Sequence, residues 1–507
     1  MDRKPKTLLI YPPITTGPLD SPASVCWPIG LAYLAAVLEK NSYPVIILDA
    51  VAEGGMYKND TGIRAGMADE EIRDFILQFN PDIIGISAMF TAYARDAHQI
   101  ASIAKKINPN ILVLFGGAHA SCNYDMVLRD NNVDYIIKGE GEETLLEIIR
   151  AYESNSDVSS VSGLIFKKDG QIKFSQNRDY IQNLDTIPFP ARHLLKIDKY
   201  LKLKSPYCLR NPLGVVISSR GCPKHCIYCS IHSVWGERWR GRSAKNVIDE
   251  IEMLYREYGI KEVHFNDDNI SADKARIHQI CDEMITRKID IKWTTPNGIA
   301  LWTLDRPLIK KMKQAGCYRL TFGIETGNPE MQKYIGKNLN LDYAKQVISW
   351  ANKEGLWTIC THIIGFPCET TQEINDTVNF AIKSGTDFAL FYNLTPFRGT
   401  QLYHIFESEN LVPSGIDEGD DFFVAEFACD TKNLTKDEIR VLQGQAYRKF
   451  MLKRIVKFLI NPFCIARKIY SLETFFYAFR LFKTFININI NLVKFKEMGA
   501  KVLYGKR

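Results

Sequence analysis

The chain has 507 residues, of which 46% are hydrophobic and 24% are charged, and its formal net charge is +6. This length exceeds what one hydrophobic core organises, and the composition excludes wholesale disorder. No apolar run reaches the roughly 18 residues that a membrane span needs. We expect a cytoplasmic protein without a secretory leader, because the apolar run in MDRKPKTLLIYPPIT is short and ends in two prolines.

Residues 1–150 alternate short apolar strands with helical periodicity. Strands are predicted at TLLIYP, PVIILDA, DIIGISAM, ILVLFGG and VDYIIKG, with helices such as GLAYLAAVLEK and DEEIRDFILQF between them. Apolar strands separated by helices predict an α/β fold with a doubly wound parallel sheet of the flavodoxin or Rossmann type. Ligands of such sheets bind beyond the carboxyl ends of the strands, where the loops FGGAHAS (115–121) and KGEGEET (138–144) would fall.

Residues 151–204 read as a hairpin and a linker. The segment GLIFKKDGQIKFS predicts two antiparallel strands that turn at Asp169 and Gly170, and LDTIPFPAR is rich in proline. Residues 205–400 then repeat a strand followed by a helix six times, with strands at GVVISSRG, EVHFNDDN, IKWTTPNG, YRLTFGIETG, TICTHIIGFP and FALFYNLTP. This alternation predicts a partial (β/α)6 barrel of the TIM type, with its site at the carboxyl ends of the strands.

Residues 401–507 show no strand period and form a predicted helical, basic region. From Arg440 to the last residue there are fifteen Lys and Arg against two Glu, a net charge of +13, so the rest of the chain carries −7. The segment AYRKFMLKRIVKFLINPFCIARKIY has no acidic residue. It fits a segment that lies on an anionic membrane surface or over a hydrophobic substrate, or a helix that packs on the barrel with Lys and Arg reaching solvent. We expect no nucleic-acid partner, because no binding module accompanies the charge.

The stretch GCPKHCIYCS places Cys222, Cys226 and Cys229 within eight residues, whereas the other nine cysteines are scattered singly. One interpretation is a structural zinc site with His225 or His232 as the fourth ligand. However, structural zinc sites usually add a second ligand pair downstream, and none follows here. The pattern favours an iron–sulfur cube with three cysteine ligands, which leaves one iron open for chemistry.

The spacing Cys-x3-Cys-x2-Cys, with Tyr228 before the last cysteine, resembles the signature of the radical S-adenosylmethionine enzymes. The resemblance implies a [4Fe-4S] cluster whose open iron chelates S-adenosylmethionine and cleaves it to a 5′-deoxyadenosyl radical. FNDDN is similar to the loop that holds the methionine amino group, FGIETG to the ribose site and IIGFPCET to the adenine-contacting segment. Carboxylates suit these positions, because they accept bonds from ammonium and hydroxyl groups. The implied S-adenosylmethionine contacts are Tyr228, Asp267, Asp268, Asn297, Glu325 and Gly365.

The first block resembles the cobalamin-binding domain of one subgroup of these enzymes, through WPIGLAYLAAVLE, GISAMFT, GGAHAS and VDYIIKGEGEETL. The resemblance implies a corrin site at the glycine loops, because glycine lets a backbone approach a ligand closely. The loop YPPITTGPLD lacks the Asp-x-His-x-x-Gly motif, and His98 in DAHQIA falls inside a predicted helix, so we expect no histidine from either under the cobalt. The implied cobalamin contacts are Gly116, Gly117, His119, Gly139 and Gly141.

Together these resemblances imply a cobalamin-dependent radical enzyme, and methyl transfer to a poorly activated carbon is the activity we expect first. A radical rearrangement or an oxidative cyclisation is the alternative. The tRNA methylthiotransferases are similar in layout, but their first domain brings three more cysteines, and this one has only Cys26 and Cys122. A zinc-binding or electron-transfer protein would leave the strand-end carboxylates unexplained. We expect a small-molecule or lipid-like substrate, an external donor of the flavodoxin or ferredoxin type, and possible peripheral contact with a membrane.

Overall fold

The computed structural model describes residues 3–16, 26–59, 62–203, 205, 207–416 and 428–484. The chain forms two compact units, each with its own sheet. Unit 1 comprises Met1–Lys202, Tyr228–Arg240 and Pro396–Phe427, and unit 2 comprises Leu203–Ile227, Gly241–Thr395 and Ala428–Arg507. The chain therefore passes between the units five times, and each unit contains segments that are far apart in the sequence.

Unit 1 is built on a seven-stranded sheet with the strand order β10-β9-β8-β7-β6-β1-β3. Its strands are β1 (Thr7–Tyr11), β3 (Val45–Asp49), β6 (Ile83–Ser87), β7 (Leu112–Gly116), β8 (Tyr135–Ile137), β9 (Leu164–Lys168) and β10 (Gln171–Phe174). Five of these strands are parallel, in the order β3-β1-β6-β7-β8. This is the order of a flavodoxin-like sheet, and it confirms the predicted doubly wound fold. The predicted hairpin is also present, and β9 adds it antiparallel to β8.

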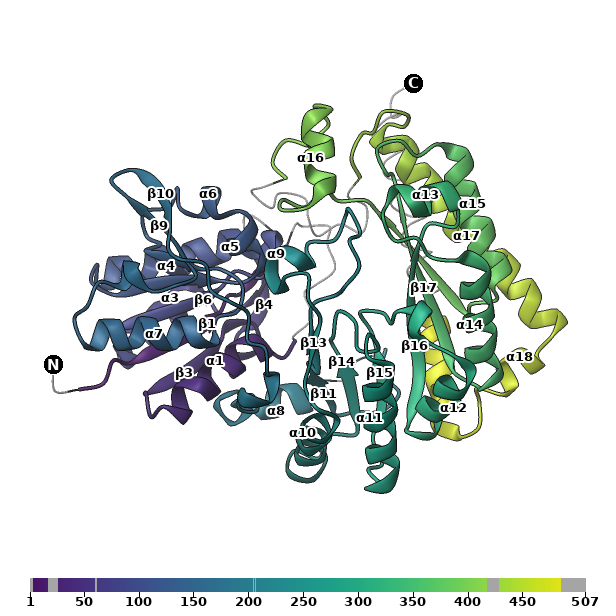
Figure 1. Cartoon of the computed structure of the whole chain (residues 1–507), viewed down its shortest axis with the longest axis horizontal. Coiled ribbons are helices and arrows are strands. Elements are labelled where there is room, and N and C mark those ends of the chain that lie inside the picture. The colour runs from purple at the N-terminus through teal and green to yellow at the C-terminus, as the bar shows by residue number, and fades with distance from the viewer. Residues whose placement is uncertain are drawn as a thin grey trace. The chain divides into compact units, whose positions relative to one another are not determined.

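Helices cover both faces of this sheet (Figure 1). They are α1 (Ile29–Lys40), α3 (Asp69–Phe79), α4 (Ala94–Ile107) and α7 (Glu142–Glu153). Successive strand residues point to opposite faces, so Leu8 and Ile10 pack with α3 and α4, whereas Leu9 packs with α1 and α7. Unit 1 also has a small antiparallel sheet that we did not predict. Its strands are short, namely β2 (Ile14–Thr16), β4 (Gly55–Asn59) and β5 (Gly62–Gly66).

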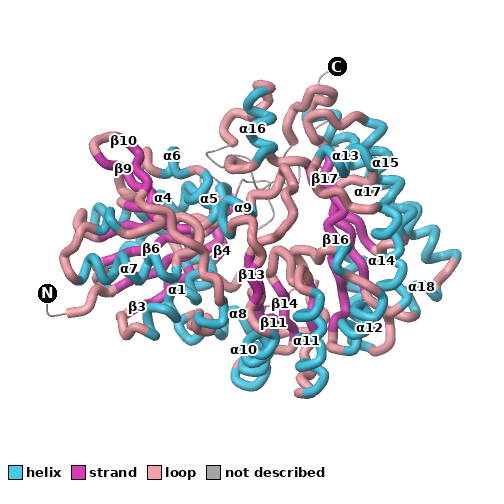
Figure 2. The backbone as a smooth tube through the Cα atoms, viewed as in Figure 1, coloured by secondary structure: helices cyan, strands magenta, loops and turns pink. Residues whose placement is uncertain are grey.

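Unit 2 contains six parallel strands in the order β11-β14-β15-β16-β17-β18, which confirms the predicted partial barrel. The strands are β11 (Leu213–Val216), β14 (Glu262–Phe265), β15 (Lys292–Thr295), β16 (Cys317–Glu325), β17 (Trp357–Ile364) and β18 (Phe388–Asn393). The helices that follow them are α10 (Ala244–Glu257), α11 (Lys274–Thr286), α12 (Arg306–Gln314), α13 (Pro329–Tyr334), α14 (Leu341–Lys353) and α15 (Thr371–Ser384). Figure 2 shows these helices alongside the magenta strands.

The C-terminal region is helical as far as the structure describes it. Its helices are α16 (Gln401–Ser408) in unit 1, and α17 (Lys436–Ile460), α18 (Phe463–Ala466) and residues 472–484 in unit 2. The first half of α17 packs on the barrel, because Ala446 and Phe450 are buried and the Tyr447 hydroxyl accepts a bond from the Phe391 N–H at 3.0 Å. Among the described residues, no helix is both long and apolar enough to cross a membrane. The basic residues from 485 onward lie outside the described residues.

Candidate active site

The residues predicted to contact S-adenosylmethionine in unit 2 lie at the carboxyl ends of consecutive barrel strands. Asp267 and Asp268 follow β14, and Asn297 lies in the turn after β15. Glu325 is the last residue of β16, and Gly365 comes directly after β17. Parallel strands present their carboxyl ends at one edge, which is where TIM-type barrels place their active sites.

The cysteine loop follows β12 (Ser219–Arg220) and precedes α9 (Ile231–Trp235). None of its three cysteines is in a disulfide, and all three are of intermediate exposure. The chain passes from unit 2 to unit 1 directly before Tyr228, so Cys222 and Cys226 belong to the barrel unit and Cys229 to the other. Three thiols at this spacing fit a [4Fe-4S] cluster, because each supplies one of the thiolates that such clusters require.

The loop after β14 holds the start of the cysteine loop. The Asp267 carboxylate accepts bonds from the Ser218 N–H at 2.8 Å and the Ser218 hydroxyl at 2.6 Å, and a third comes from the Ser219 hydroxyl. Asp268 accepts the N–H of Gly221 at 3.1 Å. Asp267 is 2% exposed and committed to these serines, so it positions the neighbouring turn.

Asp268 is less enclosed than Asp267, and burial raises the pKa of its carboxyl to about 7. The Asn269 side-chain amide lies 3.8 Å from the Cys222 sulfur. Sequence reasoning missed Asn269, although it stands next to the paired aspartates in the FNDDN stretch. The Asp-Asp-Asn run therefore supplies polar groups both to the turn before the cysteines and to the first cysteine itself.

Glu325 forms an ion pair with Lys337, whose Nζ lies 2.8 Å from Oε1. The Glu325 side chain is 11% exposed and that of Lys337 is 12% exposed. Glu325 has φ +65°, a left-handed conformation that is strained for a non-glycine residue. The sequence carried no signal for Lys337, because helix α13 separates the two residues along the chain. Strand end and lysine together hold the carboxylate in one place.

The loop after β17 is shaped by Glu369, a residue that the prediction also missed. Its carboxylate accepts the N–H groups of Gly365 at 2.7 Å and Phe366 at 3.3 Å. Glu369 is completely buried, and burial raises the pKa of its carboxyl to about 8. Gly365 has φ +94°, which only glycine adopts without strain. The signal in the sequence for the role of Glu369 was its place four residues after Gly365.

In unit 1, the predicted cobalamin contacts lie after β7 and β8. Gly116 ends β7, and a Cβ added there would have no atom within 4 Å, so this backbone is open to a ligand. At Gly117, with φ +117°, a Cβ would lie 2.7 Å from the Ala88 carbonyl oxygen. At Gly139 and Gly141, Cβ atoms would meet Val234 O at 3.2 Å and Leu34 Cδ2 at 3.1 Å. Gly117 and Gly139 are thus favoured by their positive φ and by close backbone neighbours, whereas the neighbour of Gly141 is the end of a leucine side chain.

Two histidines lie near the end of β7. His119, in α5 (Ala118–Cys122), is 4% exposed, and the Asn123 side-chain amide donates to its Nδ1 at 3.2 Å. Burial lowers the pKa of His119 to about 4, so its ring is neutral at physiological pH. His98 lies inside α4 as predicted, and its Nδ1 is 2.7 Å from Asp130 Oδ2. The hydrogen bond with Asp130 gives His98 a structural role.

The loop after β8 is anchored by a buried ion pair. Arg240 Nη1 lies 2.8 Å from Glu140 Oε1, and both side chains are 3% exposed. The Arg240 guanidinium also stacks 5.0 Å from the ring centre of Tyr180. The other Glu140 oxygen accepts the Ile181 N–H at 2.7 Å. These contacts fix the glycine loop between Lys138 and Gly141 relative to the chain that follows the hairpin.

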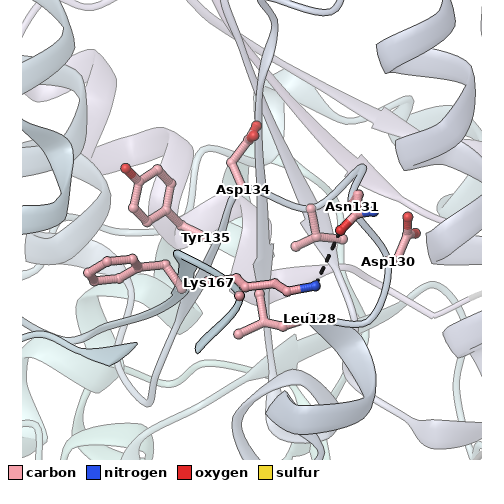
Figure 3. A pocket seen from close by; sticks show the side chains of 9 residues that line it. Leu128, Asp130, Asn131, Asp134, Tyr135 and Lys167 are labelled. Carbon is pink, nitrogen blue, oxygen red and sulfur yellow. Dashed lines mark hydrogen bonds between the residues drawn. The ribbon is translucent and has the colours of Figure 1, made fainter. Parts of the chain in front are cut away.

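A surface cavity of about 380 Å³ also opens in unit 1, and it contains none of the predicted site residues. Figure 3 shows Asp134 and Tyr135 at the start of β8, and Lys167 bonded to Asn131 at 3.4 Å. Ligands of doubly wound sheets bind at the carboxyl ends of the strands, and this cavity lies at the amino end of β8. It is therefore separate from the glycine loops.

Comparison with known proteins agrees with this geometry. Two family models match: a B12 binding domain over residues 16–149 and the radical SAM superfamily over residues 216–381. An uncharacterized methyltransferase of Pyrococcus horikoshii is 34% identical, with 93% of this chain and 99% of that protein covered. The cytidylyl-2-hydroxyethylphosphonate methyltransferase of Streptomyces wedmorensis is 34% identical, with 79% and 81% covered. The anaerobic magnesium-protoporphyrin IX monomethyl ester cyclase of Rubrivivax gelatinosus is 25% identical, with 92% and 84% covered.

A solved structure shares the fold. It is the radical S-adenosylmethionine methyltransferase TsrM from Kitasatospora setae with cobalamin and a [4Fe-4S] cluster bound, with a TM-score of 0.68, 15% identity and 89% of each chain covered. A parallel barrel with a three-cysteine loop and polar strand ends, joined to a doubly wound domain, defines a radical enzyme with a second cofactor domain. The chain belongs to the cobalamin-binding radical S-adenosylmethionine family. It is an enzyme whose cofactors are a [4Fe-4S] cluster, S-adenosylmethionine and cobalamin.

Proposed function

We propose that this enzyme transfers a methyl group to a poorly activated carbon of a small or lipid-like molecule. The observation that carries the proposal is the relation to two methyltransferases, each 34% identical over most of the chain. An oxidative cyclisation is the second candidate, because the magnesium-protoporphyrin ester cyclase aligns over 92% of the chain. Its identity is 25%, so methyl transfer is the better supported reaction.

Residues of the barrel strands and of the cysteine loop divide the work of binding. Cys222, Cys226 and Cys229 hold the cluster, and Asp268 and Asn297 face the amino-acid end of S-adenosylmethionine. The remaining contacts are Glu325 for the ribose, the Gly365 backbone for the adenine, Tyr228 beside the cluster, and Asp267 acting through the serines it binds. When bound, the cluster would supply an electron, S-adenosylmethionine a carbon radical and a methyl group, and cobalamin a methyl carrier.

The glycine loops of unit 1 are the proposed corrin site. Gly116 offers open backbone at the end of β7, and Gly117, Gly139 and Gly141 let the adjoining loops close on themselves. His119 is the histidine among the proposed corrin contacts, and burial keeps its ring neutral. Its proposed role is a hydrogen bond to a polar group of the corrin. The Glu140–Arg240 ion pair keeps the second loop in place.

Two products of S-adenosylmethionine distinguish the candidate reactions. Methyl transfer leaves S-adenosylhomocysteine, whereas radical generation leaves 5′-deoxyadenosine and methionine. With a low-potential reductant, we expect the cobalamin-loaded enzyme to form both and the cobalamin-free enzyme to form only 5′-deoxyadenosine. Both nucleosides are measured by chromatography and mass spectrometry. If the loaded enzyme forms 5′-deoxyadenosine without S-adenosylhomocysteine, methyl transfer is wrong and cyclisation or rearrangement takes its place.

We expect about one cobalamin per chain, with no protein nitrogen under the cobalt. Paramagnetic resonance of the cob(II)alamin form should show no nitrogen coupling from a lower ligand, because His98 is engaged by Asp130 and His119 by Asn123. His98→Ala should leave the spectrum unchanged. A nitrogen coupling that disappears in His98→Ala or in His119→Ala would contradict this expectation and identify the ligand.

The end of α17 supports peripheral membrane contact as a further part of the proposal. The lining of a cavity of about 330 Å³ in unit 2 includes four cationic residues, Lys353, Arg454, Lys457 and Arg467, and one acidic residue, Asp387. Next to it Leu459, Ile460 and Phe463 are 78–79% exposed. Cations beside bare apolar residues fit the anionic surface of a bilayer. The residues after 484 carry five Lys and Arg and one Glu, so their charge does not complement this cavity.

We also propose that the enzyme lies in the cytoplasm, with an external flavodoxin or ferredoxin as electron donor.

Vesicle flotation tests the membrane contact without catalysis. The protein should bind vesicles containing phosphatidylglycerol and not pure phosphatidylcholine. Lys457→Glu with Arg467→Glu should weaken binding roughly 30-fold, since each basic residue near a surface contributes about 1 kcal/mol. The matched control is Lys245→Glu with Arg256→Glu, which changes the same net charge on exposed positions of α10. Equal losses in both variants, or no binding by the parent protein, would contradict the contact.

A further inference from the structure

A cluster of metal-ligand side chains lies at the opposite end of the barrel from the cysteine loop. Cys208 precedes β11, Glu262 is the first residue of β14, and His264 follows two residues later on the same face of that strand. The Cys208 sulfur, a Glu262 carboxylate oxygen and a His264 ring nitrogen all lie within 4.8 Å of one another. Cys208 and Glu262 are completely buried, and the His264 side chain is 13% exposed.

The geometry of His264 does not fit a simple hydrogen-bond relay. Its Nε2 lies 2.9 Å from Glu262 Oε1 and 3.7 Å from Cys208 Sγ. A relay of the Cys–His–carboxylate kind uses the two different ring nitrogens, one for each partner. A single nitrogen carries either one proton or one lone pair, so it cannot both donate to the carboxylate and accept from the thiol. A cation between the three atoms would accept a lone pair from each.

The distances are close to those of a bound zinc ion. Zinc bonds of about 2.0–2.1 Å to nitrogen and oxygen and about 2.3 Å to sulfur give tetrahedral edges of roughly 3.4 Å between N and O and roughly 3.6 Å between N and S. The observed separations are 2.9 Å and 3.7 Å. Binding therefore requires His264 and Glu262 to separate by only about half an ångström.

Neighbouring groups hold the Glu262 carboxylate in place. The Tyr318 hydroxyl donates to Oε1 at 2.6 Å, and the Arg210 N–H donates to Oε2 at 2.7 Å. Ligating carboxylates are commonly oriented by such outer contacts. The buried Arg319 donates to the Tyr207 carbonyl and the Tyr477 hydroxyl, at 2.7 Å and 3.0 Å. A thiolate and a carboxylate together supply the two negative charges that a divalent cation needs.

We propose that Cys208, Glu262 and His264 bind one zinc ion, separate from the iron–sulfur cluster. One thiolate, one imidazole and one carboxylate form a donor set that suits zinc, and water completes the four ligands. The ion ties the segment before β11 to the amino end of β14. Since this end of a TIM-type barrel serves stability and the opposite end serves chemistry, the zinc is structural. This inference does not depend on the proposed reaction.

The test uses the full chain in which Cys222, Cys226 and Cys229 are changed to Ala, so that no metal binds at the cluster site. We expect one zinc per chain by elemental analysis. After removal of zinc, Co²⁺ should give visible ligand-field bands and a near-ultraviolet thiolate-to-metal charge-transfer band. Cys208→Ser should abolish the charge-transfer band and weaken zinc binding about 100-fold or more, since even losing an outer contact of a ligand costs 10–100-fold.

Two further variants make the test specific. His264→Gln should weaken zinc binding in the same way, whereas Cys281→Ser, at another fully buried cysteine, should leave it unchanged. Circular dichroism reports whether each variant is folded, and zinc should raise the melting temperature of the parent and the Cys281 variant only. A folded parent without stoichiometric zinc, or a Cys208→Ser variant that keeps the charge-transfer band, would overturn the proposal.

Discussion

Changing Cys222, Cys226 and Cys229 together to Ala will abolish both the iron–sulfur cluster and the reductive cleavage of S-adenosylmethionine. The three cysteines, none of which is in a disulfide, would supply the thiolates that such a cluster requires, and without the cluster no electron reaches the sulfonium. The reconstituted parent should contain about four iron and four sulfide per chain, as expected of a [4Fe-4S] centre. Iron, sulfide and 5′-deoxyadenosine are the quantities to measure under anaerobic conditions.

A matched control separates loss of the cluster from loss of thiols in general. The triple variant Cys26→Ala, Cys281→Ala and Cys368→Ala removes three cysteines elsewhere in the chain, and it should retain both the cluster and the cleavage activity. Zinc in place of iron in the anaerobic parent, lost in the loop variant and kept in the control, would contradict the cluster. That zinc is distinguished from an ion at Cys208, which the loop variant retains.

Glu325→Gln will keep the cluster but weaken the binding of S-adenosylmethionine by about 1–3 kcal/mol, the usual contribution of a hydrogen bond to a charged group. The carboxylate stands at the end of β16, where the proposed ribose site lies, and its strained backbone and the Lys337 ammonium hold it there. Gln keeps the size of the side chain and removes the charge. The dissociation constant is measured by equilibrium dialysis with the reconstituted enzyme.

Lys337→Met distinguishes ligand binding from structural pairing. It breaks the same ion pair but leaves the Glu325 carboxylate in place, so we expect a lower melting temperature and a smaller loss of affinity than in Glu325→Gln. If Glu325→Gln leaves the dissociation constant unchanged while both variants lose stability, Glu325 serves only to pair with Lys337. Iron content in both variants shows whether the cluster site is intact.

Much of the fold could be predicted because its signals are local. The apolar strands and the helices between them recur with fixed periods, so all five parallel strands of unit 1 and all six of the barrel appear where expected. The turn at Asp169 and Gly170 has positive φ at both residues, as the Asp-Gly pair predicts. The cysteine spacing is equally local, so the proposed cluster ligands can be inferred from the sequence without a structure. The helix around His98 follows from the same periodicity.

The remaining features depend on contacts between residues distant in sequence. The predicted hairpin becomes part of the main sheet because β9 pairs with β8, and nothing in its own residues shows that partner. Short strands such as β2 leave too few residues for a period to be recognised. The cobalamin-loop glycines illustrate a further limit, because the structure shows that Gly117 is required by the Ala88 carbonyl oxygen rather than by open space.

Side-chain partnerships were decided by tertiary structure alone. The sequence by itself determined that carboxylates stand at strand ends, but Asp267 is turned into Ser218 and Ser219 while Glu325 pairs with Lys337. Likewise, Cys208 reads as one more isolated thiol until the barrel brings it to Glu262 and His264. Residue type and period follow from neighbours along the chain, whereas the partner of a buried charge is set by which strands pair and how their loops close, because only that brings distant atoms within bonding distance.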